Sequence, residues 1–264
     1  MAGTVPLDVS NNYDFPLAGG GGGAIATLNG VTVQIFCDNF ANEINLGSDY
    51  SANVTTLGTG ATLGLTRFGG VTQGSSTTPG TTGWEPIVLN DGNTSLDATD
   101  NAFFNTGGGL SPLARYEMVA YLVSQYNLAN NTLPIQNANN QIQEAIWTLM
   151  DPTADGPVVD PSGLNPDSYL EQAKGWYVGM NSPGNTTALN AFLGHFEVVS
   201  DSTMTFPPAG PAINGFQEQI VDMNPVPPPT PTPEPRGVIW TLGALAIGAF
   251  LVKRARHSSV HATN

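Results

Sequence analysis

The hydrophobic period of this chain changes twice along its length. Before residue 110, short apolar alternations are separated by Gly, Thr, Ser and Asn, a pattern typical of strands joined by turns. Between residues 111 and 193, apolar residues recur at helical spacing, and the alternation returns after residue 195. The order of these patterns predicts an α+β fold, in which a β-rich domain carries an inserted helical block.

Local signals place individual elements within this pattern. Asn29-Gly30 joins two alternating runs and indicates a hairpin with a tight turn. Ser111 followed by Pro112 is typical of a helix start. Further strands are expected at 54–57, 62–68, 87–89, 196–200 and 216–221, and helices at 113–126, 135–150, 166–177 and 187–193.

The chain is acidic, with 21 Asp and Glu residues against 7 Lys and Arg. All the acidic residues lie in 1–235, where only three basic residues accompany them, so this part carries −18 and the remainder +4. Such a body offers no basic stripe for nucleic acid. Its only histidine, His195, leaves little room for a catalytic triad or a histidine metal site, so no cofactor or metal is expected.

The C-terminal segment differs in composition from the rest. Residues 225–235 are Pro-rich and should extend as a polyproline spacer. Residues 237–252 form an uncharged apolar stretch that would reach roughly 24 Å as a helix, slightly less than a bilayer core. The alternative for this stretch is a buried core helix. A single transmembrane helix is favoured, which divides the chain into an ectodomain at 1–223, a linker at 224–235 and a membrane segment at 236–264.

Three features at the chain end occur in a particular order. Pro233-Glu234-Pro235 precedes the apolar stretch, and Lys253, Arg254 and Arg256 follow it. This order resembles the PEP-CTERM sorting signal of Gram-negative bacteria. The resemblance implies export, transient anchoring in the inner membrane with a cytoplasmic C-terminus, and processing near Pro-Glu-Pro by an exosortase. The protein would then reach the cell surface or a polysaccharide-rich matrix.

The start of the chain departs from that family. A secretory signal peptide has a basic start and an apolar core, and the residues from Met1 to Asp8 have neither. Either the true start lies upstream, or the sequence is close to the mature form.

The single cysteine lies in the segment Phe36-Cys37-Asp38-Asn39-Phe40, and Ile142-Gln143-Glu144-Ala145-Ile146-Trp147 follows about a hundred residues later. Together these segments resemble bacterial surface thioester domains, in which a cysteine and the glutamine of a Thr-Gln-x-Ala motif form an internal thioester. The resemblance implies that Cys37 is the thiol, Gln143 the acyl donor, and amines on a surface the targets. Ile142 replaces the motif's threonine. The alternative is a buried small hydrophobe and an ordinary polar residue at the margin of the helix's apolar stripe.

Carboxylates and aromatic rings suggest further functional hypotheses. Asp91 to Asp97 spaces oxygen ligands as calcium loops do, but the EF-hand pattern fails and a polar turn is favoured. Asp38 with Glu144 could serve a secreted, polysaccharide-directed hydrolase. Aromatic residues could stack on sugars, but two of them have helical core spacing; the candidates are Trp84, Trp176 and Tyr177.

These patterns together favour a non-enzymatic, exported protein in adhesion or in the extracellular matrix, with the hydrolase as the second class. Its expected partners are the membrane, the processing enzyme, and extracellular polysaccharide or surface amines.

Overall fold

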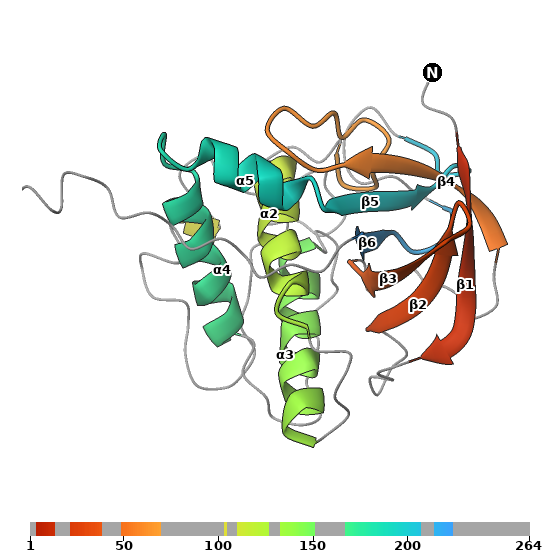
Figure 1. Cartoon of the computed structure of the whole chain (residues 1–264), viewed down its shortest axis with the longest axis horizontal. Coiled ribbons are helices and arrows are strands. Elements are labelled where there is room, and N and C mark those ends of the chain that lie inside the picture. The colour runs from red at the N-terminus through yellow and green to blue at the C-terminus, as the bar shows by residue number, and fades with distance from the viewer. Residues whose placement is uncertain are drawn as a thin grey trace, which may run out of the picture.

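A computed structural model describes residues 4–13, 22–38, 49–69, 103–104, 110–126, 133–150, 167–206 and 214–223. Figure 1 shows its strands gathered on one side of the molecule and its helices on the other. The strands are β1 (Val5–Tyr13), β2 (Gly23–Leu28), β3 (Val31–Cys37), β4 (Asp49–Thr56), β5 (Phe196–Asp201) and β6 (Gln219–Asp222). The helices are α2 (Pro112–Val123), α3 (Leu133–Met150), α4 (Asp167–Met180) and α5 (Thr186–Leu193).

The strands close into an antiparallel barrel in the order β1-β2-β3-β6-β5-β4. The last two strands enter between β3 and β4, so the chain leaves the barrel for the helices and returns to complete it. This arrangement confirms the predicted α+β fold with a helical block between β segments. It also sets residues far apart in the sequence side by side, because Cys37 at the end of β3 pairs with Gln219 at the start of β6.

The β2–β3 hairpin is confirmed. Its turn residues Asn29 and Gly30 have φ of 49° and 79°, the left-handed conformations that a tight two-residue hairpin turn requires. Asn tolerates this region better than most residues, and Gly adopts it without steric cost.

Replacing Gly30 with alanine is expected to lower the free energy of unfolding by about 1 kcal/mol, since a Cβ is disfavoured at positive φ. An added Cβ would meet nothing within 4 Å, so the backbone conformation alone sets the cost. Urea unfolding measures this loss in the free energy of unfolding. Gly64→Ala is the matched control, because that site is also open but does not have a positive φ. Equal stability of the two variants would contradict this account of the turn.

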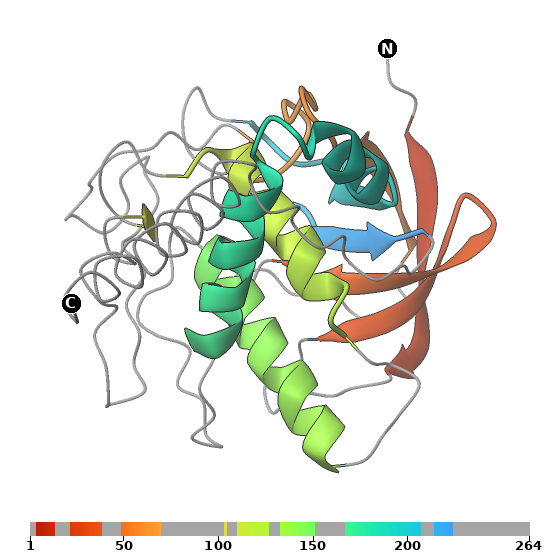
Figure 2. The ribbon, with the colours of Figure 1, turned by 60° about the vertical axis from the view of Figure 1, so that its left-hand side comes forward.

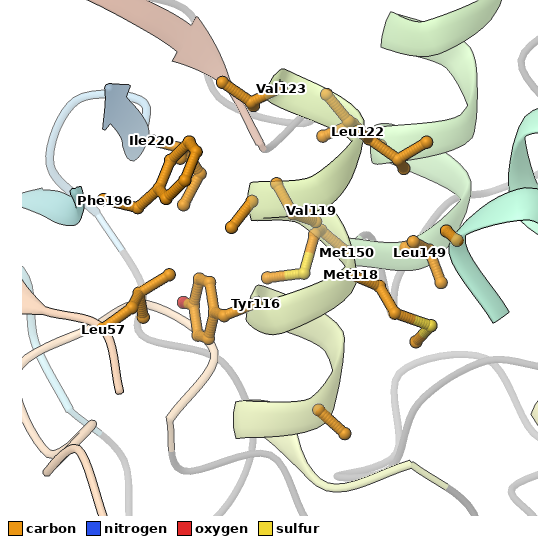
Figure 3. Packing of buried hydrophobic residues seen from close by; sticks show 14 of the residues in the cluster. Leu57, Tyr116, Met118, Val119, Leu122, Val123, Leu149, Met150, Phe196 and Ile220 are labelled. Carbon is orange, nitrogen blue, oxygen red and sulfur yellow. The ribbon is translucent and has the colours of Figure 1, made fainter. Parts of the chain in front are cut away.

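Two hydrophobic cores share the barrel wall. Because successive strand residues point to opposite faces, β5 and β6 contribute to both. The barrel interior consists of Leu7, Val9, Ala24, Ala26, Leu28, Val33, Ile35, Tyr50, Ala52, Val199 and Val221. On the outer face, Figure 3 shows Phe196 and Ile220 directed toward Val119 and Val123 of α2. In the turned view of Figure 2, α2 lies beside the barrel, and it also contacts α3 and α4.

The four predicted helices are confirmed within a few residues of their bounds. Ser111 caps α2 through a hydrogen bond from the Ala114 N–H to its side chain at 3.1 Å, and Pro112 follows in the first turn. The helix ends at Val123, three residues before its predicted end, where Ser124 is the C-cap.

The predicted strand at 62–68 is wrong. Two backbone N–H groups bond within or next to the segment instead of to a partner strand: that of Thr66 donates to the carbonyl of Leu63, and that of Gly69 donates to the carbonyl of Thr66. The N–H of Arg67 donates to the side chain of Glu218. The segment is therefore a turn that carries Arg67 inward. The strand expected at 216–221 begins only at Gln219, and the strand expected at 87–89 lies outside the described residues.

The C-terminal features lie outside the described residues: the linker, the sorting motif Pro233-Glu234-Pro235, the apolar stretch at 237–252, and Lys253, Arg254 and Arg256. Among the helices of the described part, none is both long and apolar enough for a membrane span.

Candidate functional site

Cys37 is the last residue of β3 and is 3% exposed. Its N–H donates to the carbonyl of Gly22 at 3.3 Å, and Gln219 lies opposite it on β6. Burial raises the pKa of the thiol to about 12, although hydrogen bonds from the Gly22 backbone and the Gln219 side chain lower it in part. As a free thiol, Cys37 is therefore protonated at neutral pH and shielded from reagents in solution.

Gln143 lies in the middle of α3 with its side chain fully buried. Its amide nitrogen Nε2 donates to the carbonyl oxygen of Cys37 at 2.5 Å, across 106 residues of sequence. Its Oε1 accepts a hydrogen bond from the Tyr126 hydroxyl at 2.8 Å. The structure thus brings together the two residues singled out from sequence. Gln143, expected at the margin of the helix's apolar stripe, is fully buried, and its amide bonds to the β3 end and to Tyr126.

Tyr126 follows α2 and binds the oxygen of the Gln143 amide through its hydroxyl. Its ring lies 4.8 Å from that of Phe36, which directly precedes Cys37. Its N–H donates to the carbonyl of Val123 at 3.0 Å, which fixes the backbone relative to α2. Burial is the main cause that raises the pKa of the phenol well above its usual value, and the nearby Cys37 and Glu144 act in the same direction. The hydroxyl is thus a neutral donor at physiological pH.

Next to Cys37 lies a group of fully buried polar side chains, the carboxyl cluster: Asp38, Arg67, Tyr116, Ser200 and Glu218. Glu218 is its centre. Its carboxylate accepts hydrogen bonds from the Tyr116 hydroxyl and from the backbone N–H of Arg67, each at 2.5 Å. It also accepts one from the Ser200 hydroxyl. The Arg67 guanidinium donates hydrogen bonds to the main-chain carbonyls of Asn214 and Phe216.

Asp38 adds a second carboxyl group to this cluster. Burial raises its pKa well above the usual range, and the negative charge of Glu218 and a hydrogen bond with that residue act in the same direction. The nearby Arg67 opposes the shift. The raised pKa favours the neutral form of the Asp38 carboxyl, which lies next to Cys37 in sequence.

The residues considered for sugar chemistry are placed differently. Asp38 is fully buried and Glu144 is 6% exposed, so neither carboxyl is open to a polysaccharide. Trp176 is buried, as its helical spacing predicted, and stacks on Tyr121 with ring centroids 5.1 Å apart. Tyr177 is half-buried. Within the described ranges, no group of three or more His, Cys, Asp or Glu residues could hold a metal ion. Trp84 and the segment from Asp91 to Asp97 lie outside them.

Comparison with known proteins places the chain in no group: no family model matches it, and neither the curated proteins nor the solved structures include a match. The case for a function therefore depends on the geometry of the site.

Sequence reasoning did not identify several residues of the site. The sequence pattern makes Tyr126 only the last residue of the helix expected at 113–126 and puts Arg67 inside the strand expected at 62–68. One signal was present in the sequence: Gln217, Glu218 and Gln219 are three polar residues immediately before the apolar end of a strand that enters the barrel, and all three are buried.

Proposed function

We propose that this chain is an exported, non-enzymatic bacterial surface or matrix protein that attaches covalently to amines through an internal thioester between Cys37 and Gln143. One observation carries the proposal. The side-chain amide of Gln143 is buried against Cys37, the only cysteine of the chain, although 106 residues separate them in sequence. This hydrogen bond joins the amide nitrogen to the main-chain carbonyl of Cys37, so the carboxamide lies beside the residue that carries the thiol, as a thioester between the two would require.

The chemistry balances without a cofactor. The Cys37 sulfur attacks Cδ of Gln143, a carbon–sulfur bond forms, and the carbon–nitrogen bond breaks. The thiol proton leaves with the amide group as ammonia. A primary amine of a target then attacks the same carbon. An amide forms between the target and Gln143, and the sulfur takes up a proton as the thiol. Each chain reacts once, which is why we describe the protein as non-enzymatic.

Burial of the site fits a reactive group that must survive outside the cell. Cys37 and Gln143 are almost inaccessible to water, which limits hydrolysis of an acyl–sulfur bond before a target arrives. A lone cysteine also has no internal disulfide partner that could compete for the thiol.

The delivery part of the proposal depends on the chain end. Residues 237–252 would anchor the protein in the inner membrane, with Lys253, Arg254 and Arg256 on the cytoplasmic side. An exosortase-type enzyme would process it near Pro233-Glu234-Pro235 and pass it to the cell surface or to an extracellular polysaccharide matrix. Adhesion or matrix attachment would then be its role.

Labelling with a biotinylated primary alkylamine tests the thioester. The folded protein is expected to acquire biotin that resists boiling in detergent, at a position that peptide mapping assigns to Gln143. Cys37→Ala and Gln143→Ala are expected to acquire none. Gln172→Ala, at an exposed position on α4, is the matched control and should label as the wild type does. Equal labelling of the Cys37→Ala variant would contradict the proposal.

A further inference from the structure

Both polar atoms of the Gln143 amide have partners that fix its orientation. A main-chain carbonyl can only accept, so the atom facing the Cys37 oxygen at 2.5 Å is the amide nitrogen. The carbonyl oxygen Oε1 then faces the Tyr126 hydroxyl at 2.8 Å. The nitrogen is the leaving group of the proposed reaction, and Oε1 is the oxygen that gains negative charge when sulfur attacks.

We propose that Tyr126 is a catalytic residue of the Cys37–Gln143 reaction, in which its hydroxyl stabilises the oxyanion that develops on Oε1. The inference depends on the proposed thioester and deepens it by naming the residue that controls its formation and opening. In the unreacted amide the hydroxyl already donates to Oε1 at 2.8 Å, so the donor is in place beside the oxygen on which the charge develops.

Three features prepare Tyr126 for this role. Its backbone is tied to the end of α2 through Val123, and its ring packs on Phe36 of β3, so its position follows from two elements. Phe36 directly precedes the nucleophile, which links the placement of the donor to that of the sulfur. The hydroxyl is also protonated and already bonded to Oε1, so it can donate without prior reorganisation.

The same hydroxyl would serve both directions of the chemistry. When the Cys37 sulfur adds to Cδ, the carbonyl π electrons move to Oε1. The Tyr126 O–H then donates its hydrogen bond to the new oxyanion. The carbonyl re-forms as the carbon–nitrogen bond breaks and ammonia leaves with the thiol proton. When an amine opens the thioester, an oxyanion develops on the same oxygen. Loss of the hydroxyl should therefore slow both thioester formation and amine capture.

The test measures the rate at which methylamine opens the thioester, followed by intact mass, in wild type and in Tyr126→Phe. We expect the variant to react on the order of 10² to 10³ times more slowly, or to retain the Gln143 amide although folded. Tyr121→Phe is the matched control, because it removes a half-buried hydroxyl from α2 at a ring that packs on Trp176. That variant should react at the wild-type rate.

Two further measurements distinguish the donor from a merely structural hydrogen bond. The infrared carbonyl band of the thioester should move to higher frequency in Tyr126→Phe, because a lost hydrogen bond strengthens the C=O bond. A ring-fluorinated tyrosine at position 126 preserves the packing and is a stronger donor. It should accelerate opening, and it keeps the test decisive if the phenylalanine variant does not fold.

The possible failures are distinguishable. A wild-type protein that has lost ammonia, together with a Tyr126→Phe variant that forms and opens its thioester at the same rate, would overturn the role of Tyr126 and leave the thioester intact. A wild-type protein with its full sequence mass would overturn both.

Discussion

Replacement of Glu218 with alanine is expected to lower the free energy of unfolding by about 3–5 kcal/mol, since it removes the centre of the carboxyl cluster. Three buried donors would lose their acceptor: the hydroxyls of Tyr116 and Ser200 and the backbone N–H of Arg67. Each unsatisfied buried donor costs roughly 1–3 kcal/mol, and the shared cluster makes these costs less than additive.

Chemical denaturation followed by circular dichroism measures this loss. Glu197→Ala is the matched control, because Glu197 lies on β5, the strand that carries Ser200, but is half-buried, with a 3.5 Å contact from the Thr56 hydroxyl. It should change stability by less than about 1 kcal/mol. A Glu218→Ala protein as stable as this control would show that the cluster does not hold β6 and the turn at Arg67 together.

The secondary structure could largely be predicted because it depends on local periodicity. The helical spacing from Ser111 onward and the turn at Asn29-Gly30 are confirmed. The segment at 62–68 shows the limit of that method, because its apolar residues suggest a strand. Its backbone hydrogen bonds instead close local turns and reach Glu218, more than 140 residues away. Alternation alone does not reveal such a long-range acceptor.

The barrel could not be predicted for a similar reason. Its closure depends on β6 entering between β3 and β5, which is a choice of strand partners that no local pattern records. That choice sets Gln219 opposite Cys37 and Glu218 beside Asp38.

The candidate site was predicted in part. Residue chemistry and the resemblance singled out Cys37 and Gln143, and the structure brings them into contact. The sequence could not show that the Tyr126 hydroxyl donates to the amide oxygen of Gln143. That hydrogen bond depends on where the end of α2 packs against the end of β3. Nor could it show that Asp38 and Glu144 are buried, because a carboxyl group is usually exposed.

The Cys37→Ala substitution is expected to abolish the thioester completely while leaving the fold intact. Alanine lacks the sulfur that must attack Gln143, so no ammonia can be lost. The side chain is small, and alanine keeps the backbone hydrogen bonds to the neighbouring strands. The hydrogen bonds that the thiol receives from the Gly22 backbone and the Gln219 side chain are lost. The free energy of unfolding should therefore fall by only about 1 kcal/mol. Gln143→Ala should also lose the thioester, because it lacks the acyl group.

The intact mass of the freshly purified protein tests the thioester most directly. Wild type should be lighter than the mass calculated from its sequence by one ammonia, and the Cys37→Ala and Gln143→Ala proteins should each match their calculated masses. Digestion of the wild type should yield one peptide pair joined through Cys37 and Gln143. A folded wild-type protein with its full calculated mass would contradict the internal thioester.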